Sequence, residues 1–178
     1  MLNIYDPDEN PKLREFICGS LQTHEAARQR RNCDNYITAF ERGYAIQKIQ
    51  YLHEKKKYRP ETYFTAVSIF DRYLATIGQW NFSPGHACLL ATVSMLLAAK
   101  LDQPMQPCFA RMREHLLPEE QKVVTREAYL QLEADILRTF GFDFNFPGPV
   151  PSLDRYVRIL RVNPAVLTEM ACQICMFA

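Results

Sequence analysis

The stretch Pro84-Gly-His-Ala-Cys-Leu-Leu-Ala-Thr-Val-Ser-Met-Leu-Leu-Ala-Ala-Lys100 decides the fold of this 178-residue chain. Ser83-Pro84 is a helix start signal, because proline is favoured at the first helical position. The residues that follow are apolar on nearly every face of the helix that they would form. Since a helix that is apolar all round belongs in the interior of a bundle, the stretch predicts a buried central helix.

Four further helical patterns surround this stretch. One covers about residues 35–56 and ends in Lys55-Lys56-Lys57, another begins at Pro60 and runs to Ile77, and a shorter one covers about 107–116. The last begins at Thr125, a good N-cap, and ends at Gly141. The sequence therefore predicts an all-α domain of five helices packed around the central one of the five.

The ends of the chain are expected to be separate units. Residues 1–34 predict an N-terminal arm and helix, and residues 35–147 hold the five-helix domain. The segment Asn145–Pro151 contains three prolines, which predicts a linker. Residues 148–178 then comprise this linker and two helical patterns that stop within an apolar stretch, so we expect a partial second helical domain.

Composition excludes several function classes. Lysine and arginine number 21 against 20 acidic residues, so no net charge attracts the chain to nucleic acid. The six glycines are not spaced as a phosphate-binding loop, and no catalytic motif is present, so we expect neither an enzyme nor a small-molecule substrate. The longest apolar run, about 89–99, is half of the roughly 20 residues that a bilayer requires.

The N-terminus and the cysteines indicate an intracellular protein. Acidic residues stand near the N-terminus, where a secretory signal would have basic ones, so we expect a place in the nucleus and/or cytoplasm. The short apolar run leads us to expect no membrane span. The six cysteines have no regular spacing and predict free thiols, mostly in the core. Cys172 and Cys175 lack a second ligand pair and the four histidines are dispersed, so no metal and no cofactor is expected.

Three motifs carry a resemblance to a known family. Thr65-Ala-Val-Ser-Ile-Phe-Asp-Arg-Tyr-Leu74 resembles the second-helix signature of the cyclin box, and the central stretch ending at Lys100 resembles its third helix. Leu130-Gln-Leu-Glu-Ala-Asp-Ile-Leu-Arg-Thr-Phe-Gly-Phe-Asp-Phe144 is similar to its fifth. The motifs occur in the family's order and cover about Asn35 to Pro147. The resemblance implies an N-terminal cyclin box of five helices, followed by the start of a second box.

The resemblance also implies roles for individual residues. In cyclins the residues that match Lys100 and Glu133 lie together and hydrogen-bond the backbone of a cyclin-dependent protein kinase, so they and the adjacent Leu101 are the expected kinase-binding residues. In the cyclin box an arginine of the first helix pairs with the aspartate of the second-helix signature. The matching residues are Arg42 and Asp71, which would hold the first two helices together; if that pair is buried, losing either member should cost several kcal/mol. The implied function is a regulatory cyclin that activates its kinase, and the chemistry would belong to the partner.

One departure from the family leaves alternatives open. Cell-cycle cyclins surround the first-helix arginine with an apolar patch and a tryptophan that dock Arg-x-Leu substrate motifs. Here Lys48 stands in the place of the tryptophan, and the other neighbours are Glu41, Gly43, Tyr44 and Ala45. A structural subunit that uses the cyclin fold without a kinase is therefore the alternative. A DNA-binding cyclin fold is less favoured, because the basic clusters 28–31 and 55–59 are short.

Overall fold

A computed structural model describes residues 39–77, 84–105, 107–144 and 149–150, and these contain six α-helices and no strand. The helices are α2 (Ala39–Lys56), α3 (Pro60–Ile77), α4 (Pro84–Asp102), α5 (Phe109–Arg113), α6 (Pro118–Val123) and α7 (Arg126–Thr139). The predicted all-α class is confirmed for these residues. The predicted arm and helix at 1–34, and the linker and second domain at 148–178 apart from residues 149–150, lie outside them.

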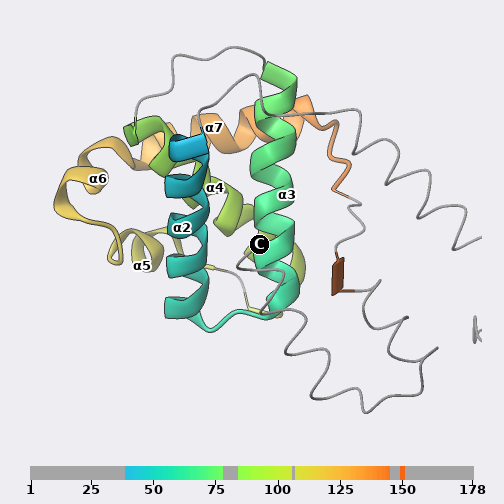
Figure 1. Cartoon of the computed structure of the whole chain (residues 1–178), viewed down its shortest axis with the longest axis horizontal. Coiled ribbons are helices and arrows are strands. Elements are labelled where there is room, and N and C mark those ends of the chain that lie inside the picture. Colours follow the sequence, from blue (N-terminus) through green and yellow to red (C-terminus); the bar gives the residue numbers. More distant parts are fainter. Residues whose placement is uncertain (1–38, 78–83, 106, 145–148, 151–178) are drawn as a thin grey trace, which may run out of the picture. The chain divides into compact units, whose positions relative to one another are not determined.

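Helix α4 is the centre of the bundle, as its sequence predicts. Every residue from Ala87 to Ala99 is buried. α4 contacts α2, α3, α5, α6 and α7, and Figure 1 shows it behind α2 and α3 with α7 crossing beyond. One window of this helix, Gly85–Asp102, is long and apolar enough to cross a membrane, but 72% of it is buried inside the protein, as in the core helix of a bundle.

Local signals account for most of the helix boundaries. α3 and α4 begin at their prolines, Pro60 and Pro84. The Thr125 side chain accepts a hydrogen bond from the Ala128 backbone N–H at 3.2 Å, which caps α7. After α7 the chain turns through Gly141 at φ +57° and Phe142 at φ +61°, both left-handed, and glycine reaches that region without strain. These predicted starts and this predicted stop are confirmed.

Two expectations about the segment between α4 and α7 were wrong. The helix expected over 107–116 is only five residues long, Phe109–Arg113. A second short helix, α6, follows it, with Pro118 at the first position and Glu119 and Glu120 in the first turn. The connection is therefore two short helices where one was expected, so the domain has six described helices and not five.

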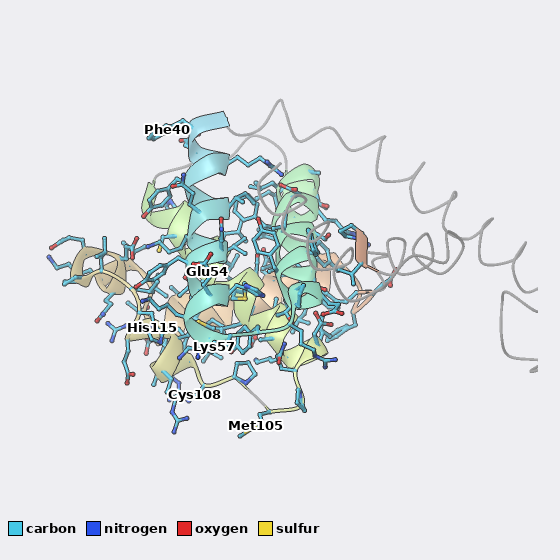
Figure 2. The ribbon with its side chains drawn as sticks, turned by 60° about the horizontal axis from the view of Figure 1, so that its bottom comes forward. Phe40, Glu54, Lys57, Met105, Cys108 and His115 are labelled. Carbon is cyan, nitrogen blue, oxygen red and sulfur yellow. The ribbon has the colours of Figure 1, made fainter. Side chains whose placement is uncertain are left out.

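Of the cysteines, the structure describes Cys88 and Cys108, and both are free thiols. Cys88 is buried in α4, and burial raises the pKa of its thiol to about 12. Cys108, by contrast, is exposed just before α5, where Figure 2 shows it on the same side of the molecule as Met105. The expectation that the cysteines are core residues is wrong for Cys108, which is exposed at the N-cap position of α5.

Candidate kinase-binding site

The predicted kinase-binding residues come from the end of the central helix and the middle of α7. Lys100 is the first exposed residue after the buried run of α4, and Glu133 lies on the face of α7 that is turned toward α4. The lysine Nζ atom is 2.6 Å from Oε1 of Glu133, with 36% of the lysine side chain and 12% of the glutamate side chain exposed. The structure thus brings together two residues that are 33 positions apart in sequence.

Tyr129 completes this pair, although the sequence analysis placed it only in the core stripe of its helix. Its hydroxyl donates a 2.5 Å hydrogen bond to the same oxygen, Oε1 of Glu133. The Lys100 Nζ atom lies 5.6 Å from the centre of the tyrosine ring, within range of a cation–π contact. The signal that could have identified Tyr129 is its position four residues before Glu133, which places both side chains on one helix face.

The protonation of Tyr129 follows from its surroundings. Burial raises the pKa of its phenol far above its usual value, and the hydrogen bond to Glu133 and the negative charge there raise it further. The hydroxyl therefore remains a donor at any physiological pH. The tyrosine ring itself stacks on Phe109, with the ring centres 4.7 Å apart, which fixes the plane of the ring.

Apolar side chains lie close to the charged pair in sequence. Leu101, the third predicted binding residue, directly follows Lys100 and is half exposed. Leu130, one turn before Glu133 on α7, is exposed to a similar degree, and Met105 is almost fully exposed. Exposed leucine and methionine side chains beside a partly buried charged pair are typical of a protein-binding surface, in which apolar contacts exclude water from the polar ones.

The predicted Arg42–Asp71 pair joins α2 to α3. Arg42 donates from Nε to Oδ1 of Asp71 at 3.0 Å and from Nη2 to Oδ2 at 2.9 Å, a two-pronged contact. The exposed fractions of the two side chains, 44% and 23%, show that water reaches both groups. The pair is therefore not fully buried, so the condition for a loss of several kcal/mol is not met.

The residues that the resemblance matches to a substrate-docking patch, Tyr44 and Lys48, belong to an internal polar cluster. Lys48 Nζ lies 2.6 Å from Oε1 of Glu120, and the Tyr44 hydroxyl donates to the same oxygen at 2.6 Å. The other glutamate oxygen accepts from the backbone N–H of Leu117 at 2.8 Å. The sequence analysis noted Lys48 and Tyr44 but missed Glu120, whose only signal was its place in the first turn after Pro118.

The charges in this cluster are balanced. Burial alone would raise the pKa of Glu120, but hydrogen bonds from Lys48, Tyr44 and the Leu117 N–H outweigh burial and hold the pKa below its usual range. Glu120 is therefore an anion whose acceptors are used within the domain. The side chains of Tyr44 and Lys48 are therefore engaged in contacts within the domain.

Among the described residues, no group of three or more His, Cys, Asp or Glu side chains could hold a metal ion. Cys172 and Cys175 lie outside those residues. The chemistry that the described surface offers is recognition, with a lysine donor, a carboxylate acceptor and apolar side chains next to them in sequence.

Comparisons with known proteins show the family of the chain. Residues 15–145 match the family model described as "Cyclin, N-terminal domain". The chain is 32% identical over 108 residues to the G2/mitotic-specific cyclin-B3 of Canis lupus familiaris, covering 61% of this chain and 8% of that protein. It is 27% identical over 130 residues to Cyclin-A2 of Xenopus laevis, covering 73% of this chain and 30% of that protein. The chain thus spans less than a third of the length of either relative.

Proposed function

Because the chain belongs to the cyclin family, we propose that it is a regulatory subunit that binds and activates a cyclin-dependent protein kinase through Lys100, Leu101 and Glu133. The observation that carries the proposal is the 2.6 Å contact between Lys100 Nζ and Glu133 Oε1. It joins the two matched residues at the surface, next to exposed apolar side chains. ATP and the phosphoryl-transfer chemistry would belong to the kinase, and the pair would act inside the cell, in the nucleus or the cytoplasm.

The two charged groups suit recognition of a polypeptide backbone. The Lys100 ammonium has three N–H donors, and within the described residues one of them is directed to Glu133. The remaining donors can bind carbonyl groups of a partner, while the glutamate can accept from a partner N–H. Burial of Leu101 and Leu130 against the partner would exclude water and strengthen these hydrogen bonds. Activation would follow from the shift that such binding imposes on the regulatory helix of the kinase.

The test compares two double variants for binding to a purified cyclin-dependent kinase and for activation of its phosphorylation of a histone peptide. Lys100→Ala/Glu133→Ala should weaken binding by about 30-fold or more, as for residues at the centre of an interface. Glu119→Ala/Lys122→Ala removes an exposed lysine–glutamate pair, 2.8 Å apart on α6, and should leave binding unchanged. Equal binding by both variants, or no binding of any cyclin-dependent kinase by the wild-type chain, contradicts the proposal.

A second candidate function rests on the Tyr44–Lys48–Glu120 cluster. Since Tyr44 and Lys48, which the resemblance matches to the substrate-docking patch, bind Glu120 instead, the chain can serve as a helical block in an assembly without presenting substrates to a kinase. The same experiment separates the two functions, because a structural subunit would not raise the activity of any added cyclin-dependent kinase. A stable complex with other proteins and without a kinase would support this second function.

A further inference from the structure

Glu133 Oε1 is the shared acceptor for two described side chains on different elements. It accepts from Lys100 at the end of α4 and from Tyr129 one turn earlier on α7. Within the described part of the chain, no hydrogen bond reaches the second carboxylate oxygen, Oε2. The two donors therefore hold the carboxylate through one oxygen and leave the other as an acceptor for a partner.

Tyr129 acts on both members of the charged pair at once. Its hydroxyl fixes Glu133, and its ring faces the Lys100 ammonium at 5.6 Å. The ring is in turn held by stacking on Phe109 at 4.7 Å and is almost fully buried. A buried, stacked ring has few alternative rotamers, so the groups that it contacts also lose freedom before any partner arrives.

We propose that Tyr129 is the positioning residue of the kinase-binding surface, holding Lys100 and Glu133 in the geometry that the partner meets. This inference rests on the proposed function. Preorganisation raises affinity because the ordering of side chains is completed before binding and not during it. Tyr129 itself is buried beneath the pair, so it acts through Lys100 and Glu133 rather than by contact with the kinase.

The substitution Tyr129→Phe tests this role with little change to packing, because it removes the hydroxyl and keeps the ring. Tyr73→Phe is a matched control. Tyr73 is also buried, and its hydroxyl also donates to a carboxylate on α7, Asp135 Oδ2, at 2.6 Å. Tyr129→Phe should lower kinase affinity about tenfold, the range for one hydrogen bond to a charged group, and Tyr73→Phe should leave it unchanged.

A double-mutant cycle separates positioning from general stability. In a chain that carries Glu133→Ala, the further change Tyr129→Phe should lower kinase affinity by less than about twofold, because its hydrogen-bond acceptor is already absent. If the affinity losses of Tyr129→Phe and Glu133→Ala are additive in the double variant, the proposal is overturned. An equal loss of affinity in Tyr73→Phe also overturns it, because the effect would then follow from destabilisation alone.

A measurement on the free chain keeps this inference separate from the proposed function. The NMR order parameter of the Lys100 ammonium group in the full-length chain should fall in Tyr129→Phe and remain unchanged in Tyr73→Phe. If the wild-type chain binds no cyclin-dependent kinase, the proposed function fails, while a fall confined to Tyr129→Phe still supports positioning. An order parameter that Tyr129→Phe does not change overturns the positioning role, whatever the binding result.

Discussion

The ammonium group of Lys48 on α2 lies 2.6 Å from Oε1 of Glu120 on α6, and only 13% and 8% of the two side chains are exposed. This ion pair attaches a helix of six residues to the bundle. A helix that short has almost no stability of its own. Its place in the fold therefore depends on this polar contact as well as on its packing against α4, whereas α4 itself is buried among five other helices.

Replacing Glu120 with glutamine should destabilise the domain. The change leaves the Lys48 ammonium enclosed without its counter-charge, and breaking a buried pair in this way costs about 3–5 kcal/mol at full burial. We expect about 2–3 kcal/mol here, since the pair keeps slight contact with water. Urea unfolding followed by circular dichroism measures the change, and Glu119→Gln on the exposed face of α6 should alter the unfolding free energy by less than about 0.5 kcal/mol. Equal effects of the two variants would contradict the enclosed ion pair.

Stability should also depend on acid through Glu120. The pKa of Glu120 is lowered in the folded chain, while the unfolded chain has the usual value near 4.5. At a pH between these two pKa values, the unfolded chain binds more protons than the folded chain. The contribution of Glu120 to the free energy of unfolding is therefore complete above the unfolded pKa, and it is lost as the pH falls through the folded pKa. Unfolding free energies from about pH 7 to about pH 3 should converge for wild type and Glu120→Gln. A constant difference over that range would refute this linkage.

The Arg42–Asp71 pair should stabilise the domain only modestly. Because water reaches both groups, we expect a coupling energy of about 1 kcal/mol from a double-mutant cycle of Arg42→Ala and Asp71→Ala. Arg42→Lys should lose most of this coupling, because lysine cannot make the two-pronged contact. A coupling of several kcal/mol would show that the pair is more enclosed than its exposed fractions of 44% and 23% indicate.

Ser94 offers a route to a more stable chain. Its hydroxyl is buried in α4 and has no hydrogen-bond partner among the described atoms. Ser94→Ala removes this unsatisfied group and introduces a better helix former, so the unfolding free energy should rise by about 1 kcal/mol. Thr92 lies two residues earlier, and its hydroxyl donates to the Cys88 carbonyl at 2.8 Å. Thr92→Val should therefore not raise the free energy of unfolding. If both variants raise it, the added apolar surface explains the effect and the unsatisfied Ser94 hydroxyl does not.

Peptides with an Arg-x-Leu motif should not dock on α2. The side chains of Tyr44 and Lys48, which the resemblance to cyclins matches to the docking patch, are bound to Glu120. Fluorescence anisotropy with a labelled Arg-x-Leu peptide should detect no binding to this chain, and a cell-cycle cyclin that has the apolar patch provides the positive control. Binding to this chain that Lys48→Ala abolishes would show that the cluster opens to accept the peptide.

The sequence predicted those parts of the fold that depend on local signals. Pro60, Pro84 and Thr125 mark helix starts whatever the rest of the chain does, and the uniformly apolar α4 could only be central. Helix α6 was missed because its six residues, Pro118–Val123, carry no apolar stripe. Its Glu120 contacts Tyr44, a residue 76 positions earlier in the chain, and no local signal predicts that contact.

The candidate site was predictable only in part. The resemblance identified Lys100, Leu101 and Glu133, but no spacing rule places the end of one helix against the middle of another 33 residues later. In the sequence, Tyr129 is one more position in the apolar stripe of α7. The stripe pattern does not distinguish the partner of its ring from the partner of its hydroxyl. The structure separates the two, since the ring packs on Phe109 while the hydroxyl reaches Glu133.

The position of Lys100 directly after the buried run Ala87–Ala99 has a consequence for the folding of the surface. Backbone amides in such a helix exchange with solvent mainly when the whole domain opens, since every neighbouring helix packs against it. The contact between Lys100 and Glu133 requires that α4 and α7 are packed against each other. We therefore expect the Lys100–Glu133 contact to be lost together with the packing of α4 against α7 when the domain unfolds.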